Sequence, residues 1–221
     1  MTPKELALST GARIDRATEW LPFIESAMSE FGIDTRLRKA MFLAQIGHES
    51  GGLHYMVEIW GNTAAQQHYE GRKDLGNTHA GDGFKYRGRS PLQITGLFNY
   101  VKVTRALNVD FVNNPEWLEL PEHGARAAAW WWQDHKLNRF ADADDCTGCT
   151  RVINGGTNGL PQRLALYEAA KMAIPEIIQA TVETTTEAVT ETIQAAPVKQ
   201  PHPVVVFIMA LFKFLAGFRK T

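Results

Sequence analysis

The fold of this chain is decided by residues 37–58, which read LRKAMFLAQIGHESGGLHYMVE. Apolar side chains recur from Leu37 to Ile46 at the spacing of one helix face. Asp34 or Thr35 is a suitable N-cap, and the Gly-Gly pair at 51–52 is a typical stop signal. The pattern therefore predicts an apolar helix that ends just before residue 51.

Glu49 falls in the last turn of this predicted helix, and Glu58 follows in the loop after it. The helix dipole disfavours an anion at this end, and apolar packing withholds water. Both effects favour a carboxyl group that keeps its proton, which a glycosidase needs to protonate a leaving sugar oxygen. A glutamate before Gly-Gly is often only structural, and for His48 helix packing is favoured over a catalytic role.

The composition is that of a packed globular protein. The 221 residues include six Trp and eleven Phe, which is enough for one good-sized core. A net charge of −1 gives no electrostatic basis for binding nucleic acid. The first residues show no apolar stretch behind Lys4, so we predict no secretory signal peptide.

The two cysteines, Cys146 and Cys149, form a single C-x-x-C pair. One such pair supplies half of a typical zinc site, and no nearby histidine has the spacing to complete it. The pair also lacks the strand-helix context of a thioredoxin-like motif. A structural pair is the favoured interpretation, with redox and metal-binding roles as the alternatives.

Three segments differ in composition. Residues 1–175 are predicted to form a mostly helical globular domain, residues 176–203 a Thr/Glu/Pro linker, and residues 204–221 an apolar C-terminal helix. Between Gly51 and Arg89 the helical periodicity of apolar residues is lost, which predicts a long loop region. A long loop inside a compact domain is often functional. Further helices are expected at 14–31, 96–107, 122–136 and 160–174.

The loop region holds a third acid and two arginines. Glu70 lies in the motif YEGR, and Arg87 and Arg89 lie in YRGRSPLQITG. Either arginine can pair with a carboxylate and keep it ionised. Arginines and glycines in a loop also serve simply to solvate and turn it.

Two later turns hold polar candidates. Gln93 and Thr95 alternate, so a short extended segment would point both side chains into one cleft. A hydroxyl there can hold a water molecule against a sugar ring. Asn154 in the motif INGG can orient a substrate amide, although Asn-Gly-Gly by itself predicts only a turn.

Taken in order, the motifs HESGGLHYMVE, YEGRKDLGNT, GDGFKYRGRSPLQITG, AAWWW and INGGTNGLPQR resemble glycoside hydrolase family 19. Within that family they are most similar to the chitinase-like endolysins of bacteriophages and prophages. The resemblance covers about residues 15–174. It implies a mainly α-helical, lysozyme-like domain with a cleft between two lobes, no metal or organic cofactor, and inverting hydrolysis by two carboxylic acids.

The resemblance also implies roles for individual residues. Glu49 corresponds to the general acid of the H-E-[ST] motif, and Glu58 to the base of the bacterial members. Thr95 corresponds to the hydroxyl that holds the attacking water, so these three residues are the predicted catalytic set. Substrate contacts are predicted for a second set: Gln93, Asn99, Asn154, Arg89 and Glu70.

The correspondence with the family is incomplete at one position and ambiguous at another. The family usually reads G-R-G before the Gln motif, whereas Ser90 replaces the last glycine here and changes the backbone freedom of the loop. Glu70 stands where plant-type members place their base after a longer loop. We favour Glu58 as the base, because HESGGLHYMVE matches the bacterial spacing without a gap.

The apolar tail over residues 204–218 is short for a membrane span. Its 15 residues would extend about 22 Å as a helix, against a hydrocarbon core of about 30 Å. Lys213 interrupts it, and a charge at mid-bilayer is costly. An interfacial or partly inserted helix is therefore favoured over a full span and over packing against the lytic domain.

Together these inferences predict an endolysin that hydrolyses β-1,4 bonds between amino sugars in peptidoglycan strands and so lyses the host cell. We expect a monomer that accumulates in the host cytoplasm, reaches the wall through a separate phage pore, and contacts inner-membrane lipid through its tail. The alternatives are a chitinase, a lytic transglycosylase, and an inactive glycan-binding module.

Overall fold

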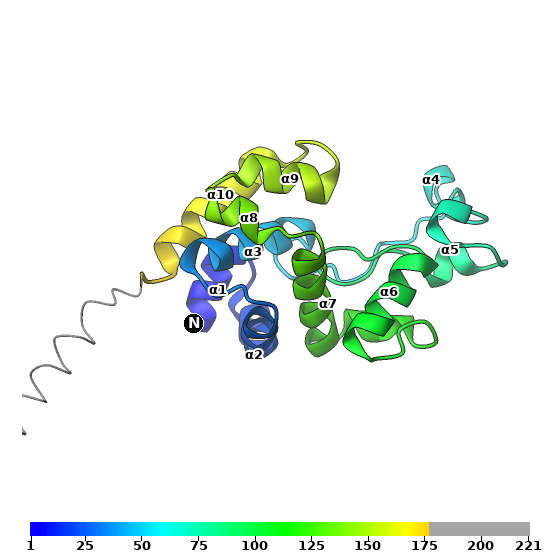
Figure 1. The fold of residues 1–221 in the computed structure, drawn as a ribbon, viewed down its shortest axis with the longest axis horizontal. Coiled ribbons are helices and arrows are strands. Elements are labelled where there is room, and N and C mark those ends of the chain that lie inside the picture. Colours follow the sequence, from blue (N-terminus) through cyan, green and yellow to red (C-terminus); the bar gives the residue numbers. More distant parts are fainter. Residues whose placement is uncertain (177–221) are drawn as a thin grey trace, which may run out of the picture. The chain divides into compact units, whose positions relative to one another are not determined.

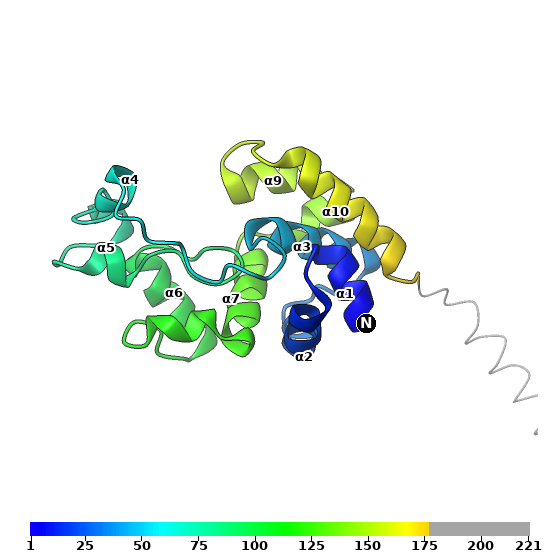
Figure 2. The same ribbon diagram turned by 180° about the vertical axis from the view of Figure 1, so that it is seen from behind.

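The computed structural model describes residues 1–176, which are mainly α-helical as the sequence predicts (Figures 1 and 2). The helices are α1 (Pro3–Thr10), α2 (Ile14–Glu30), α3 (Arg36–Glu49), α4 (Ala64–Gln67), η1 (Lys73–Leu75), α5 (Asp82–Lys85), α6 (Leu97–Leu107), η2 (Pro115–Glu119), α7 (Pro121–Asp134), α8 (Asn138–Asp142), α9 (Cys146–Asn154) and α10 (Leu160–Ala173). Isolated β-bridges join Arg89 to Val57 and to Ile94. None of these helices is long and apolar enough to cross a membrane. Apart from residue 176, the predicted linker and apolar tail lie outside the described residues.

Local sequence sets where the first helices begin and end. Thr2 caps α1 through a capping box with Glu5, and Gly11 ends it with a left-handed φ of 72°. Thr35 is the N-cap of α3, where its side chain accepts a hydrogen bond from the backbone N–H of Arg38. Of the two predicted caps of this helix, Thr35 is therefore the correct one.

The core forms around α3, whose residues from Ala40 to Gly47 are all buried. At Gly47 an added Cβ would lie 2.4 Å from the carbonyl oxygen of Thr10, so the glycine lets α1 and α3 approach closely. Phe42 of α3 packs edge-on against Trp132 of α7, with the ring centroids 5.4 Å apart. The helix that carries Glu49 is thus fixed on several sides.

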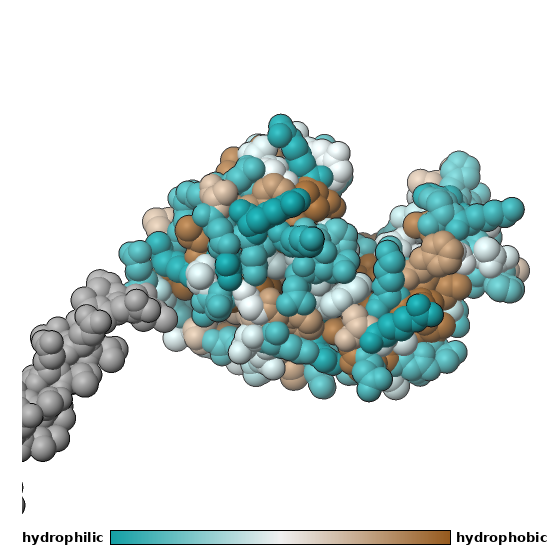
Figure 3. Space-filling view, in the orientation of Figure 1, coloured by the Kyte–Doolittle hydropathy of each residue, from teal (hydrophilic) through white to brown (hydrophobic). Residues whose placement is uncertain are grey.

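Within the described residues, α9 and α10 lie at one end and α4 and α5 at the other (Figures 1 and 2). Helices α6 and α7 lie between them, together with the extended segments that Arg89 bridges, and α3 packs against α10. The surface is hollowed between the part that carries α9 and the part that carries α4 and α5 (Figure 3). This hollow agrees with the predicted cleft between two lobes.

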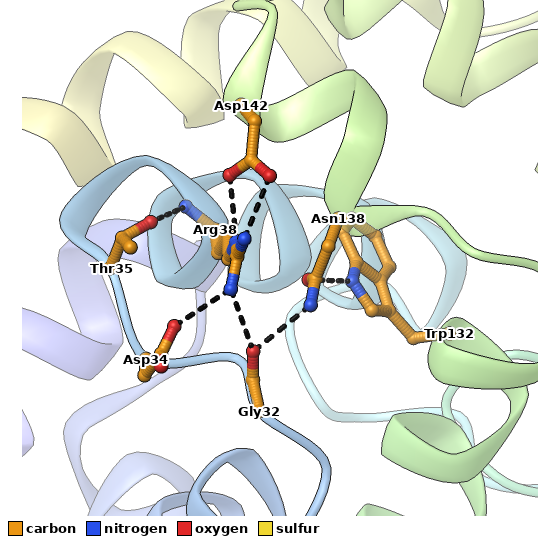
Figure 4. Close-up of polar contacts among 7 residues, drawn as sticks. All are labelled: Gly32, Asp34, Thr35, Arg38, Trp132, Asn138 and Asp142. Carbon is orange, nitrogen blue, oxygen red and sulfur yellow. Dashed lines mark hydrogen bonds and ion pairs between the residues drawn. The ribbon is translucent and has the colours of Figure 1, made fainter.

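A polar cluster joins α3 to α7 and α8 (Figure 4). The guanidinium of Arg38 donates to both carboxylate oxygens of Asp142, at 2.7 and 2.8 Å, and to Asp34 at 3.0 Å. It also donates to the carbonyl of Gly32, which accepts a second bond from the side chain of Asn138 at 2.9 Å. The cluster therefore anchors the start of α3, far along the helix from Glu49.

The long helices agree with the prediction, whereas several short ones were not predicted. The five expected helices are confirmed as α2, α3, α6, α7 and α10, with ends within a few residues of those expected. The region from Gly51 to Arg89 is not one unbroken loop, because it contains the short helices α4, η1 and α5. The short helices α1, η2, α8 and α9 were not expected either.

Candidate active site

Glu49 is the last residue of α3, as predicted, and its side chain is 20% exposed. The chain leaves the helix through Ser50, and Gly51 and Gly52 then adopt left-handed φ values of 60° and 73°. The expected apolar surroundings of the carboxylate are wrong, because its Oε1 atom accepts a hydrogen bond from the guanidinium of Arg163. Among the described residues, Oε2 has no hydrogen-bond partner.

Arg163 is fully buried on α10 and is oriented by buried partners. Its Nη1 atom donates to Oε1 of Gln45 at 2.5 Å, and its Nε donates to the carbonyl of Asn158 at 3.3 Å. Gln45 is itself fully buried, and its amide nitrogen donates to the hydroxyl of Thr150 at 3.1 Å. Because Thr150 occupies the donor end of the amide, the acceptor end faces Arg163. Side chains from α3, α9 and α10 thus fix the cation that meets Glu49.

Sequence reasoning missed Arg163, although it lies within the motif INGGTNGLPQR. A signal for it was available in the pattern of α10. Arg163, Tyr167 and Ala170 are spaced by four and three residues, and all three are buried. A cation on the apolar face of a helix must find a charged or strongly polar partner.

His48 packs between α3 and α10 next to this arginine. Its Nδ1 atom lies 2.9 Å from Oε1 of Gln162. An added Cβ at Gly159 would lie 2.2 Å from Cε1 of His48, so a glycine is needed there. Burial lowers the pKa of His48, and the charge of Arg163 lowers it further. These contacts agree with the favoured interpretation of His48 as a helix-packing residue.

Glu58 lies in an extended segment whose neighbour Val57 pairs with Arg89. The backbone N–H of Glu58 donates to the carbonyl of Gly88 at 2.8 Å. Its carboxylate accepts from Nε2 of Gln66 at 3.1 Å and from the N–H of Gly88 at 3.3 Å. Burial raises the pKa of Tyr69, and the charge of Glu58 raises it further. Gln66, buried and not foreseen, is the side chain that orients Glu58.

Glu70 has a different environment from Glu58. Its Oε1 accepts from the backbone N–H of Gly81 at 2.5 Å, and its Oε2 accepts from that of Gly83 at 2.9 Å. Both donors lie at the start of α5, so the carboxylate ties the preceding loop to this short helix. Both carboxylate oxygens of Glu70 therefore accept hydrogen bonds from the backbone.

Gln93 and Thr95 come together beside Gly88. An added Cβ at Gly88 would lie 2.4 Å from Oε1 of Gln93 and 3.2 Å from Oγ1 of Thr95. The same glycine contacts Glu58, so these three side chains surround one point of the backbone. The expected extended geometry is wrong at Gln93, which has a φ of 52° and lies in a turn closed by its N–H to the carbonyl of Ser90. The hydroxyl of Thr95 donates to the carbonyl of Gln93 at 3.0 Å.

Arg89 is only 4% exposed, so its contacts are with the protein interior. A contact with substrate was predicted for it. Its guanidinium donates to Glu119 at 2.7 Å, to the carbonyl of Lys85 at 2.8 Å and to the hydroxyl of Tyr100 at 2.9 Å. The pairing of this arginine with a carboxylate was expected, but the partner, Glu119, was not. Ser90 has a φ of 69° and is fully buried, so the replaced glycine position does retain a left-handed backbone.

The remaining predicted substrate residues lie at helix ends. Asn99, in the first turn of α6, is partly exposed and donates from its amide to the carbonyl of Thr95 at 2.8 Å. Asn154 is the last residue of α9 and is exposed. Asn99 is thus tied to the loop around Gly88, whereas Asn154 belongs to the part of the structure that carries α9.

Cys146 and Cys149 are free thiols, buried in α9. Burial raises the pKa of both thiols, which disfavours the reactive thiolate. Cys146 accepts a weak hydrogen bond from Gln45 at 3.7 Å and so packs against the support of Arg163. Within residues 1–176, no group of His, Cys, Asp and Glu side chains is arranged to hold a metal ion. The favoured interpretation of the pair as structural agrees with this packing.

Comparison with known proteins identifies the family of this chain. Residues 21–185 match the chitinase class I family, glycoside hydrolase family 19. A Haemophilus influenzae protein described as a glycosyl hydrolase family 19 domain-containing protein is 31% identical over 66% of this chain and 84% of its own length. An endochitinase of Pisum sativum is 32% identical over 61% of this chain. The chain spans only 52% of that plant enzyme.

Solved structures show the same fold. Chitinase C of Streptomyces griseus superimposes with a TM-score of 0.63 over 78% of this chain and 75% of its own, at 22% identity. A bacterial family 19 chitinase superimposes with a TM-score of 0.65 over 79% of this chain and 95% of its own, at 25% identity. The fold and the site therefore define a glycoside hydrolase of the chitinase type. The chain belongs to glycoside hydrolase family 19.

Proposed function

We propose that this protein hydrolyses β-1,4 bonds between amino sugars of peptidoglycan by a single inverting displacement. The observation that carries the reaction type is a pair of carboxylates, Glu49 and Glu58, each oriented by its own buried donor. An inverting glycosidase uses one carboxyl as acid and the other as base, with the two about 6.5–9.5 Å apart to admit a water molecule. No metal ion is needed for this reaction.

Glu49 acts as the general acid in this proposal. Arg163 holds Oε1, and the described residues leave Oε2 without a partner, so Oε2 is the atom that carries the proton to the leaving oxygen. The buried contacts of Arg163 with Gln45 and Asn158 keep the carboxyl plane in one orientation. The guanidinium thus positions the acid without touching the sugar.

Glu58 acts as the base and Thr95 as the group that steadies the attacking water. The N–H donors from Gln66 and Gly88 match an ionised carboxylate, which can only accept hydrogen bonds. The hydroxyl proton of Thr95 is directed to the carbonyl of Gln93, which leaves its oxygen lone pairs to accept from water. Glu70 is the weaker choice of base, because both of its oxygens hold the backbone at the start of α5.

Peptidoglycan is proposed as the substrate because the ordered motifs of this chain resemble those of phage and prophage endolysins. The same similarity supports action on the wall of the host cell after release from its cytoplasm. The apolar sequence of residues 204–218, followed by Arg219 and Lys220, supports contact with membrane lipid. A monomer suffices for the reaction, since Glu49, Glu58 and Thr95 all belong to one chain.

Mass spectrometry of the muropeptides released from purified sacculi tests this proposal. We expect fragments with a reducing-end sugar, because water is the nucleophile. Fragments with an anhydro end would instead identify a lytic transglycosylase. If sacculi bind the protein but release nothing, it is a glycan-binding module.

Chitin is the second candidate substrate, because the Pisum sativum relative and the superimposed structures are chitinases. Chitin shares the β-1,4 linkage between N-acetylglucosamine units. Soluble chitooligosaccharides, assayed beside sacculi, separate the two proposals. Cleavage of the oligosaccharides with no release from sacculi would replace peptidoglycan by chitin as the substrate.

A further inference from the structure

A groove of about 300 Å³ runs along one side of α6. Its walls include Asp74 and Leu75 from η1 and Phe98, Asn99, Lys102 and Arg105 from α6. We call it the α6 groove. None of these residues takes part in the proposed proton transfers.

The α6 groove has an excess of positive charge. Lys102 and Arg105 are both exposed, and neither forms an ion pair with another residue in the described part of the chain. Asp74 does not offset them, because Arg72 already pairs with both of its oxygens at 2.7 and 2.5 Å. Two cations are therefore available to a ligand in the groove.

The exposed face of α6 combines these cations with an aromatic ring. Phe98, Lys102 and Arg105 follow one another at helical spacing on one face. The ring of Phe98 is 54% exposed and packs over Gly76, where an added Cβ would lie 2.5 Å from the ring. A flat apolar surface next to two cations suits a ligand that combines a sugar or peptide backbone with an anionic group.

The α6 groove is linked to the proposed catalytic centre through Asn99. Asn99 lines the groove, and its amide nitrogen donates to the carbonyl of Thr95 at 2.8 Å. Thr95 in turn lies beside Gly88, which contacts the carboxylate of Glu58. A glycan held at the catalytic centre can therefore present its substituents to the groove.

We propose that the α6 groove binds the carboxylates of the peptide stems that peptidoglycan strands carry. This inference rests on the proposed function and names the part of the substrate that the groove recognises. Stem peptides bear several carboxylates, whereas chitin is uncharged. Lys102 and Arg105 thus favour a peptide-bearing strand over a bare one, chiefly through affinity and association rate, and salt weakens their effect.

The test compares Lys102→Gln/Arg105→Gln with a control of equal charge change, Lys4→Gln/Arg139→Gln, on the remote helices α1 and α8. We expect the groove variant to raise KM for intact sacculi about threefold to tenfold, as two exposed charge contacts of about 0.3–0.7 kcal/mol each predict. KM for chitooligosaccharides should stay the same, and so should kcat on both substrates. The control variant should match the wild type throughout.

Sacculi stripped of stem peptides by an amidase, with the lactyl carboxylates that this hydrolysis leaves on the strand then converted to amides, identify the ligand. On this substrate the groove variant and the wild type should behave alike. A defect that persists on stripped strands would assign the cations to another wall anion and overturn the proposal, as would equal effects of the groove and control variants on intact sacculi.

Binding separates this inference from the proposed function. In a Glu49→Gln background, cosedimentation with intact sacculi measures affinity without cleavage. If the wild type releases nothing from sacculi, the proposed function fails, and the cosedimentation comparison still decides whether the groove binds stem peptides. If the groove substitutions do not weaken cosedimentation, the groove proposal fails even when hydrolysis is observed.

Discussion

Arg163 is the residue on which the geometry of the proposed acid depends, because it is fully buried and donates to the carboxylate of Glu49. A buried guanidinium needs an acceptor for its other donors, and Gln45 supplies one at 2.5 Å. Gln45 reaches neither carboxylate of the proposed catalytic pair in the described contacts. It is therefore a positioning residue that acts through Arg163.

Gln45→Leu should lower kcat while leaving KM nearly unchanged. Leucine has a similar size, but it leaves Nη1 of Arg163 without its acceptor, which costs about 1–3 kcal/mol of stability. The released guanidinium then no longer holds Glu49 in one orientation. Steady-state kinetics on chitooligosaccharides and urea unfolding measure the two effects. Wild-type kcat in a variant that is destabilised as expected would show that Gln45 serves stability alone.

At the scale of elements, the Arg38 cluster fixes the start of the helix that carries the acid (Figure 4). The hydrogen bond from Arg38 holds the pKa of Asp142 below its usual value, against the opposing effect of burial. Asp142 is 44% exposed, so solvent screens part of this interaction. The ion pair of Arg38 with Asp142 stabilises the fold most above the usual pKa of a carboxylate. This stabilisation is lost as the pH falls through the lowered pKa of Asp142.

Arg38→Gln should reduce the free energy of unfolding by about 1 kcal/mol at neutral pH and low salt. The loss should shrink in high salt and at acidic pH, where Asp142 is screened or protonated. Urea unfolding of the variant and the wild type, at low and high salt and at neutral and acidic pH, measures this loss of unfolding free energy. Arg13→Gln is the matched control, because Arg13 pairs with Asp15 at 83% and 61% exposure and should have no measurable effect. Equal losses in the two variants would contradict the assigned role of the cluster.

The sequence was sufficient to predict the long helices, because an apolar face of about three to five turns leaves a clear period. It was not sufficient for α4, α5 and η1, whose three or four residues span only about one helical period. Such short helices depend on capping contacts, such as that of Thr63 with Gln66. The position of Glu49 at a helix end was predictable from Gly51 and Gly52. Its contact with Arg163 was not, since the two residues are 114 positions apart.

At the scale of the whole molecule, the tail outside the described residues has a composition unlike that of the helical domain. Phe207, Phe212, Phe214 and Phe218 would bury apolar area favourably in lipid, at about 25 cal/mol per Å². Arg219 and Lys220 can meet anionic headgroups. We therefore propose that the tail affects where the enzyme acts, and that the chemistry belongs to the helical domain.

Truncation after Pro197 should leave hydrolysis of purified sacculi unchanged and reduce cosedimentation with anionic liposomes. Neutral liposomes are the control for the contribution of Arg219 and Lys220. Lysis of intact cells from inside should also weaken. Loss of sacculus hydrolysis, or unfolding of the truncated protein, would show that the tail is part of the folded domain.

The assignment of Glu49 as acid and Glu58 as base is tested most directly by the hydrolysis rates of Glu49→Gln, Glu58→Gln and Glu70→Gln on one substrate. We expect the first two variants to lose about two to four orders of magnitude in kcat, since an amide can neither donate nor accept the required proton. Glu70→Gln should keep most of its rate, because the amide oxygen can still accept from one backbone N–H at the start of α5. An inactive Glu70→Gln with wild-type melting temperature beside an active Glu58→Gln would contradict the account, as would an active Glu49→Gln.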